Sequence, residues 1–390
     1  IFEGASDIHN EPEETEIAVR YRIDGILRRL MSLPKTVGSG IVARIKILAS
    51  LKLDEHRLPQ DGRFKIEDDN YKISFRVSTL PVFNGEKIVL RILDEGNQLL
   101  KLDDLGFREV DLHKIQSNIT RPHGMILVTG PTGSGKTTTL YAILNQLNTP
   151  EVNISTIEDP IEYRMPHVNQ SQANSKIGFS FASGLRALLR QDPNIFMVGE
   201  IRDQESVEIA IQAAMTGHIV LSTIHTNDAP GTLPRLIDMG VVPFLIASTV
   251  NIVLAQRLVR KICSHCIMSY TLDKEAIKTL SQEFDIALLM KTMGQEQKNK
   301  TDAKTIDRLL FFRGKGCPKC GNTGYKGRMG IYEVLEVSDE IKKLIINRTS
   351  ATEIRKEAVK EGMSSMLEDG FVKARNGITT IEEVLRVTRE

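Results

Sequence analysis

The sequence lacks the features that would place it within a membrane or on a nucleic acid. It contains no apolar run approaching the ~20 residues of a membrane-spanning helix, and no charged-then-apolar signal segment at its start. Its 51 basic and 50 acidic residues leave a net charge of +1, so no overall field attracts nucleic acid or anionic lipid. These absences predict a cytoplasmic protein with no nucleic-acid partner and no direct membrane insertion.

Cysteine is also scarce. The four cysteines form two Cys-x-x-Cys pairs, Cys263 with Cys266 and Cys317 with Cys320. In a reducing compartment such pairs usually hold a metal ion instead of forming disulfides. Four thiolates at ~2.3 Å complete a tetrahedral Zn²⁺ site and leave no position open for chemistry, so we expect structural zinc. Four unligated thiols are the alternative.

Composition and the first residues bound the architecture. The 390 residues are 41% hydrophobic and 26% charged, which is typical of a globular protein of two or three domains. The chain begins with Ile1, and "IFEGASDIH" is typical of the interior of a domain. We therefore expect the sequence to be a fragment that lacks an N-terminal region.

The first part of the chain alternates short β-type runs with turns. Examples are "EIAVRYRIDG" and "GEKIVLRIL", and the predicted reversals lie at Gly62, Asn70 and Gly85. One helix is predicted in "GSGIVARIKILASLKL", because its apolar residues recur near a 3.6-residue period. These residues are Ile41, Ile45, Leu48 and Leu51. The pattern predicts an α+β domain at residues 1–97 and a linker at 98–107, which overlaps the polar stretch "LDEGNQLLKLDDLG".

From residue 108 the pattern changes to apolar runs such as "GMILVTG", "NIFMVGE" and "IVLSTIH", separated by helical segments. Continuous apolar strands between helices predict a doubly wound α/β sheet covered on both faces. Ligands of such sheets bind at the carboxyl ends of the strands. Within this domain, residues 259–334 are predicted to be a cysteine-containing insert, with "KTMGQEQKNKTDAK" as a flexible excursion, and residues 335–390 to be helical.

A phosphate-binding loop follows the run "GMILVT" and precedes a predicted helix. Its pattern is Gly130-x-x-x-x-Gly135-Lys136-Thr137. The glycines let backbone N–H groups converge on the β-phosphate of ATP, Lys136 reaches the β- and γ-phosphates, and Thr137 ligates Mg²⁺. A chance glycine-rich turn is the alternative. The predicted nucleotide-binding residues of the loop are Gly130, Pro131, Thr132, Gly133, Ser134, Gly135, Lys136, Thr137 and Thr138.

Acidic residues follow two neighbouring apolar runs. Glu158 and Glu162 lie in "EDPIE" after "NISTI", and Glu200 follows "NIFMVG". A P-loop ATPase needs such carboxylates to hold Mg²⁺ and to orient the attacking water. Gly199 stands where an ordinary second nucleotide motif has Asp, so the chain is not a generic P-loop enzyme.

Together these motifs resemble the secretion ATPase superfamily of hexameric motors, and within it the type IV pilus assembly and type II secretion branch. The matching stretches are "GPTGSGKTTTLYA", "STIEDPIEY", "LRQDPNIFMVGEIRD" and "TGHIVLSTIHTNDA", and "PQDGRF" and "ASDIHNEPEE" match as well. The resemblance covers essentially the whole chain. It implies a PAS-like first domain and a RecA-like ATPase domain.

The resemblance also implies roles for individual residues. Lys136 and Thr137 are assigned to phosphates and Mg²⁺, Glu200 to Mg²⁺ and the water network, and Glu162 to the general base. A helix-capping turn before Pro160 is the alternative for the acidic cluster that includes Glu158. His218 and His225 match the family's histidine box, which implies a hydrogen-bonding role in coupling the nucleotide state to neighbouring elements; a structural role is the alternative.

Four arginines match positions that the family places around the nucleotide: Arg76 and Arg91 in the first domain, and Arg186 and Arg190 in "GLRALLRQD". The guanidinium fork is suited to neutralising charge on a transferring phosphoryl group. If domain closure delivers Arg76 and Arg91, hydrolysis and domain rotation are one event. Exposed salt-bridging arginines are the alternative.

The cysteines separate branches of the superfamily. Pilus retraction and conjugation-type ATPases generally lack the tetracysteine element, whereas pilus assembly and type II secretion ATPases generally carry it. "NTPEVNIST" and "HTNDAPGTLPRLIDMGVVPFLIAS" favour pilus assembly. The resemblance then implies a homohexamer that hydrolyses ATP and drives pilin polymerisation through an inner-membrane platform protein. A type II secretion ATPase and a nucleotide-gated scaffold are the alternatives.

Overall fold

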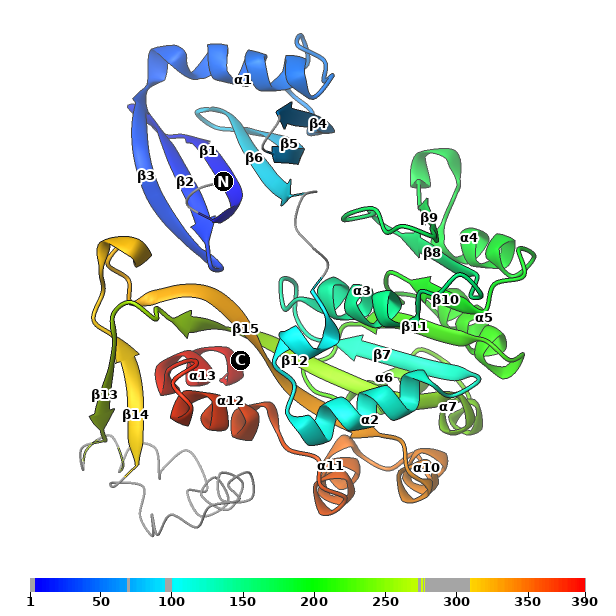
Figure 1. The fold of residues 1–390 in the computed structure, drawn as a ribbon. Coiled ribbons are helices and arrows are strands. Elements are labelled where there is room, and N and C mark those ends of the chain that lie inside the picture. The colour runs from blue at the N-terminus through cyan, green and yellow to red at the C-terminus, as the bar shows by residue number, and fades with distance from the viewer. Residues whose placement is uncertain are drawn as a thin grey trace. The chain divides into compact units, whose positions relative to one another are not determined.

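The computed structural model describes residues 4–68, 71–94, 100–272, 275, 277 and 309–389. The chain forms two compact units (Figure 1). The first unit comprises Ile1–Gln98 with Glu162–Arg164, and the second comprises Leu99–Ile161 with Met165–Glu390.

The first unit is a six-stranded antiparallel sheet with one α-helix, α1 (Gly38–Leu48). The strand order is β3-β2-β1-β6-β5-β4. Val42 and Ile45 of α1 pack against the buried sheet residues Val77, Ile88 and Leu90. This arrangement confirms the predicted α+β class. The strands are β1 (Ala5–Pro12), β2 (Glu16–Ile23), β3 (Ile26–Pro34), β4 (Gln60–Asp68), β5 (Tyr71–Val82) and β6 (Gly85–Asp94).

One predicted reversal in this unit is wrong. Gly62 lies inside β4, opposite Val77 of β5, and does not end a strand. A Cβ atom at Gly62 would lie 2.6 Å from the carbonyl oxygen of Ala49, so the glycine serves the close approach of another backbone segment. Gly85 does begin β6 after a turn, and Asn70 lies outside the described residues.

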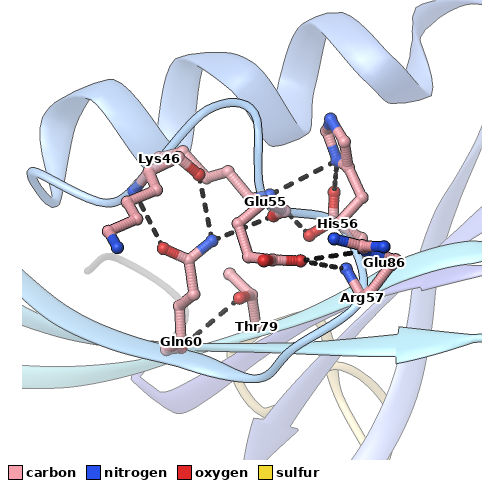
Figure 2. Close-up of polar contacts among 8 residues, drawn as sticks. Lys46, Glu55, His56, Arg57, Gln60, Thr79 and Glu86 are labelled. Carbon is pink, nitrogen blue, oxygen red and sulfur yellow. Dashed lines mark hydrogen bonds and ion pairs between the residues drawn. The ribbon is translucent and has the colours of Figure 1, made fainter.

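The helix α1 buries a lysine where the apolar period predicts only hydrophobic residues. Leu48 is 39% exposed, whereas Lys46 is 0% exposed. Figure 2 shows the reason: Lys46 Nζ lies 2.6 Å from Glu86 Oε1 and donates to the carbonyl oxygen of Glu55 at 2.7 Å. His56 Nδ1 lies 2.6 Å from the other Glu86 oxygen. An ion pair therefore makes this burial possible, and hydrophobic periodicity cannot reveal it.

Replacing Lys46 with Met is expected to destabilise the first unit by about 3 kcal/mol, because Glu86 would remain buried without its main partner. Burial alone would raise the pKa of Glu86, but hydrogen bonds from Lys46 and His56 reverse this and lower it. The stabilisation is therefore present above the unfolded pKa of about 4.3 and is lost as the pH falls below it.

Hydrogen exchange of amides in β5 and β6 would measure this local stability. Lys52→Met is the matched control, because the Lys52 side chain is exposed and its contact with Gln60 is made by the backbone N–H, which the substitution keeps. Equal exchange rates in the two variants would contradict the expected role of the buried pair.

The second unit is built on a seven-stranded sheet in the order β15-β12-β7-β11-β10-β8-β9. Neighbouring strands are parallel except β15, which runs antiparallel to β12. Every residue of β7, β8 and β10 is buried, so the central strands are covered on both faces, as predicted. The strands are β7 (Gly124–Thr129), β8 (Ile154–Glu158), β9 (Val168–Gln172), β10 (Ile195–Val198), β11 (Ile219–Ile224), β12 (Val250–Ile262) and β15 (Tyr325–Glu336).

Helices accompany this sheet along the chain (Figure 1). Those that precede or connect its parallel strands are α2 (Glu109–Ile119), α3 (Lys136–Leu147), α4 (Phe181–Leu188), α5 (Gln204–Met215), α6 (Thr232–Asp238) and α7 (Pro243–Thr249). Within the described ranges, no helix combines the length and apolarity that crossing a bilayer requires.

The C-terminal part is helical, as predicted. Its helices are α10 (Asp339–Ile346), α11 (Ala351–Lys360), α12 (Met366–Arg375) and α13 (Ile381–Thr388). Each begins after a hydroxyl residue whose side chain accepts a backbone N–H of the first turn, which satisfies a donor that the helix itself cannot pair. These N-cap residues are Ser338, Ser350, Ser365 and Thr380.

The cysteines lie between β12 and β15. Both ends of the predicted insert, residues 259–262 and 325–334, continue these two strands of the main sheet. A separate two-stranded antiparallel sheet, β13 (Ile267–Thr271) with β14 (Leu310–Gly314), lies between them in the chain. The stretch "KTMGQEQKNKTDAK" lies outside the described residues.

Candidate nucleotide site and cysteine cluster

The phosphate loop joins the end of β7 to the start of α3. Gly130, Gly133 and Gly135 have φ values of +144°, +79° and +90°, which side chains with a Cβ rarely adopt. A Cβ at Gly130 would also lie 2.4 Å from the carbonyl oxygen of Gln256. The glycines are thus required by the backbone path. This loop has the geometry that presents N–H groups to an anion at a helix N-terminus.

Two side chains of the loop fit an anionic ligand. Lys136 Nζ donates to the carbonyl oxygens of Gly130 and Pro131 at 2.8 and 3.0 Å, so the ammonium lies against the phosphate loop. Burial lowers the pKa of Lys136, and the charge of Glu200 opposes that shift. The buried Ser134 Oγ has no hydrogen-bond partner among the described residues. A phosphate would give Ser134 Oγ an acceptor and would offer Lys136 an anionic one in place of the two carbonyl oxygens.

Gln256 supports the loop from the neighbouring strand β12. It is 1% exposed, accepts the hydroxyl proton of Thr139 at 2.7 Å and donates to the carbonyl oxygen of Ser134 at 2.7 Å. The amide therefore ties the loop to the first turn of α3. Sequence reasoning missed this residue; the one available signal is a polar side chain within the apolar run "NIVLAQRLV".

Gln256→Leu is expected to weaken nucleotide binding by about 1–3 kcal/mol, because it leaves the buried Thr139 hydroxyl and Ser134 carbonyl unpaired. Titration with a fluorescent ADP analogue measures the dissociation constant. Gln212→Leu, at an exposed position of α5, is the control that should bind normally. An unchanged dissociation constant for Gln256→Leu would refute a supporting role.

Glu200 lies directly beyond β10, at the same edge of the sheet as the phosphate loop. Its side chain is 13% exposed and contacts Arg202 Nη2 at 2.6 Å and His225 Nε2 at 3.5 Å. Its charge also acts on Lys136. The structure thus brings together three of the predicted site residues, Lys136, Glu200 and His225. Arg202 was not predicted.

Glu158 at the end of β8 is surrounded by protein donors. It is 2% exposed and accepts hydrogen bonds from the Tyr141 hydroxyl, from Thr156 Oγ1 at 2.6 Å and from Gln170 Nε2 at 3.2 Å. These contacts tie α3, β8 and β9 together. A role for Glu158 at the bound nucleotide and its Mg²⁺ stays a prediction.

His218 lies away from the phosphate loop within its own chain. It precedes β11, and its carbonyl oxygen accepts the N–H of Gly124 at the start of β7, whereas Gly130 follows the end of β7. The six residues of β7 place these two ends about 20 Å apart. His218 Nδ1 lies 2.8 Å from the carbonyl oxygen of Ala213, and its ring packs against Phe196. Within the chain, these contacts are of the structural kind that the alternative interpretation predicts, and the coupling role of His218 stays a prediction.

Glu162 and two of the predicted arginines belong to the first unit. Glu162 Oε2 lies 3.4 Å from Arg76 Nη2, and Arg91 Nε donates to Asp7 Oδ1 at 3.0 Å. Arg91 thus forms the kind of ion pair that the alternative interpretation predicts. In the second unit, Arg186 pairs with an exposed glutamate of α5, and Arg190 donates to the carbonyl oxygen of Arg186 at 2.8 Å. Roles for these arginines at the nucleotide stay predictions.

The four cysteines converge to form a cluster that could hold a metal ion. Their Sγ atoms all lie within 4.8 Å of one another, and three of the sulfur-to-sulfur distances are 3.9, 3.9 and 3.7 Å. A tetrahedron with metal–sulfur bonds of ~2.3 Å has edges of about 3.8 Å. None of the four forms a disulfide. The cluster therefore fits a tetrahedral metal site.

Backbone donors favour a thiolate in this cluster. Burial would raise the pKa of Cys320, but hydrogen bonds from the N–H groups of Cys317 and Gly324, together with those from the Cys317 and Cys266 thiols, outweigh it and bring the pKa to about 6, whereas burial raises the pKa of Cys266 to about 11. The two N–H groups lie 3.2 and 3.3 Å from Cys320 Sγ. Since the thiolate is the form that binds a metal, the donors prepare the site for an ion.

Comparison with known proteins decides the family. Residues 1–386 match the family described as "Type II/IV secretion system protein". The chain belongs to this family of ATPases. It is 45% identical over 390 residues to the type II secretion system ATPase E of Vibrio cholerae, covering 100% of this chain and 73% of that protein. It is also 45% identical over 389 residues to the type IV pilus assembly ATPase PilB of Thermus thermophilus, covering 100% of this chain and 42% of that protein.

The chain spans only part of these relatives. It covers 65% of the type IV pilus assembly ATPase PilB of Myxococcus xanthus, to which it is 46% identical over 386 residues, or 99% of this chain. Among solved structures, it is 25% identical to the pilus retraction motor PilT with bound ADP, with a TM-score of 0.64, covering 100% of this chain and 94% of that chain. The ATPase DotB of Legionella pneumophila shares the fold, with a TM-score of 0.68 and 20% identity over 99% of this chain and 92% of its own.

Proposed function

We propose that this chain is the motor part of a type IV pilus assembly ATPase. The observation that carries the proposal is the convergence of Lys136, Glu200 and His225 beside a glycine-rich loop at one edge of the second unit's sheet. A cation, a carboxylate and an imidazole at a phosphate loop suit the hydrolysis of a terminal phosphate. The pilus assembly relatives add support, since they match the whole length of the chain.

ATP and Mg²⁺ are the proposed ligands of this site. Thr137 and Glu200 would hold Mg²⁺, directly or through water, and Lys136 would neutralise charge on the β- and γ-phosphates. Glu162 is proposed as the general base. Arg186 and Arg190 are proposed to lie around the nucleotide, and Arg76 and Arg91 to approach the phosphates when the domains close, so that closure and hydrolysis accompany one another.

Zn²⁺ is the proposed occupant of the cysteine cluster. Four thiolates leave no open coordination position, which suits a structural ion. The cluster joins the two ends of the segment between β12 and β15. The metal would hold this segment in place and take no part in hydrolysis.

The proposed working form is a cytoplasmic homohexamer at the inner membrane, which passes its motion to a platform protein that adds pilins to the filament. The proposed domains are residues 1–97, a linker at 98–107, and an ATPase domain at 108–390 that includes the cysteine insert. Support for the assembly comes from the family alone.

A type II secretion ATPase is the second candidate, because the Vibrio cholerae relative is as similar as the Thermus thermophilus one. Deleting the gene and complementing it with the wild type or with Glu200→Gln distinguishes the two. Loss of surface pili with normal exoprotein secretion, restored only by the wild type, supports the proposal. Loss of exoprotein secretion with normal piliation would replace it with the second candidate, and restoration by both forms would favour a non-hydrolysing scaffold.

A further inference from the structure

The loop that follows β11, residues 225–229, is held at both ends by polar contacts. At its start, the backbone N–H of Thr226 donates to Thr129 Oγ1 at 2.8 Å, and Thr129 is the last residue before the phosphate loop. At its end, the backbone N–H of Ala229 donates to Glu333 Oε2 at 2.8 Å. Because His225 is the first residue of this loop, the two anchors hold the backbone from which its ring projects.

The anchors lie in one row of the sheet. Ile224 of β11 is in register with Thr129 of β7, Thr129 with Ala255 of β12, and Ala255 with Glu333 of β15. Loop 225–229 therefore begins beside β7 and ends at a carboxylate of β15, two strands further across the sheet. Sequence separates Thr129 from Glu333 by about half of the chain, so only folding brings them together.

Arg355 of α11 completes the second anchor. Its Nη1 lies 2.7 Å from Glu333 Oε1, and its Nη2 lies 2.9 Å from Asp228 Oδ2. The other Asp228 oxygen accepts the N–H of Gly231 at 2.7 Å. One guanidinium thus bridges a carboxylate of the loop and a carboxylate of the sheet, which a lysine ammonium cannot do with the same planar geometry.

Because Glu333 is buried, its carboxylate depends on its hydrogen-bond donors. The Glu333 side chain is 1% exposed, and both of its oxygens are used, one by Arg355 and one by Ala229. Burial raises the pKa of Glu333, and the charge of Arg355 opposes that shift. Removing the guanidinium would leave a buried carboxylate with one donor fewer, and the loop would lose its side-chain attachment at Asp228.

We propose that Glu333 and Arg355 are positioning residues for ATP hydrolysis: they hold loop 225–229 so that His225 remains beside Glu200. Neither residue contacts the phosphate loop in the described contacts, so both act through the loop. The inference rests on the proposed function of Glu200. Its consequence is that a displacement of α11 changes the position of His225. The C-terminal helices are thereby coupled to the nucleotide site.

Arg355→Gln and Arg355→Lys in the full-length protein test this inference. We expect Arg355→Gln to lower kcat about tenfold while the dissociation constant of a fluorescent ATP analogue changes less than about threefold, because loss of position costs rate more than binding. Arg355→Lys should recover part of kcat, since it keeps the charge and loses the fork.

Arg386→Gln is the matched control. Arg386 of α13 also pairs a partly exposed guanidinium with a buried carboxylate, Glu383, whose other partner is Arg260 of β12. It should lower the unfolding temperature by less than Arg355→Gln, because Arg260 still pairs with Glu383, and should leave kcat unchanged. In a double-mutant cycle, Asp228→Asn should add little to Arg355→Gln, because both break the same bridge.

The outcomes separate the inference from the function on which it rests. Wild-type kcat in folded Arg355→Gln, or additive effects in the cycle, would overturn the inference if Glu200→Gln is inactive. If Glu200→Gln itself releases phosphate at the wild-type rate, the proposed function fails, and the inference fails with it. An equal loss of kcat in Arg355→Gln and Arg386→Gln would reduce the bridge to a general stabilising contact.

Discussion

Glu200→Gln is expected to lower steady-state phosphate release from ATP by about 10²–10³-fold. Glu200 is the carboxylate at the phosphate-loop edge that contacts His225, and its charge acts on Lys136. The amide keeps the shape of the side chain and removes its charge, so it can neither hold Mg²⁺ nor orient water as a carboxylate does. Nucleotide binding should change much less, because the loop and Lys136 remain.

Glu208→Gln provides the control for this prediction. Glu208 is an exposed residue of α5 whose Oε1 accepts a hydrogen bond from Gln204, and its replacement should leave turnover unchanged. A coupled assay of phosphate release, with nucleotide affinity measured in parallel, gives both quantities. If Glu200→Gln and the wild type release phosphate equally, the protein is a nucleotide-gated scaffold.

Removal of the metal is expected to unfold β13 and β14 locally. The purified protein should contain about one zinc ion per chain, and chelation or Cys320→Ser should abolish it. Structural zinc in small domains contributes roughly 10–16 kcal/mol of apparent binding free energy, and that energy is coupled to folding. The two-stranded sheet β13–β14 makes its backbone pairs beside the cluster, as Lys315 N–H to Cys266 O shows, so it should lose order first.

Metal analysis by mass spectrometry and hydrogen exchange in β13 and β14 measure the two parts of this prediction. Ser264→Ala, in the exposed turn between Cys263 and Cys266, is the control that should retain both the metal and the protection. A protein that is free of metal after growth in zinc-replete medium, yet protected in β13 and β14, would show that four thiols pack without an ion.

The hydrophobic periodicity of the sequence predicted much of the fold and gave the wrong result where a charged side chain is buried. The apolar runs at β7, β10 and β11 predicted central strands correctly, because a strand covered on both faces has few positions that face solvent. Lys46 is buried in α1 because Glu86, forty residues later, supplies the opposite charge. No local pattern contains that information, since the pairing exists only after β6 folds against the helix.

The candidate site likewise has parts that the sequence predicted and parts that it did not. The phosphate loop and the Cys-x-x-Cys pairs are recognisable because their chemistry requires particular residues at short, fixed spacings. Gln256, Glu333 and Arg355 belong to no motif of fixed spacing. Nothing in the residues around them predicted that the amide of Gln256 or the ion pair of Glu333 with Arg355 supports the site. His218 and His225 come from one motif match, but folding brings only His225 to the edge of the sheet that carries the phosphate loop, because His218 lies at the other end of β11.

Short-range spacing alone thus establishes that this chain has a phosphate loop, an acidic strand end and a set of four cysteines, because each follows from residues that are neighbours in the chain. Folding of the whole domain determines which distant groups hold these parts in place. Thr129, Glu333 and Arg355 meet at loop 225–229 because strand register and helix packing bring together residues that the linear order separates.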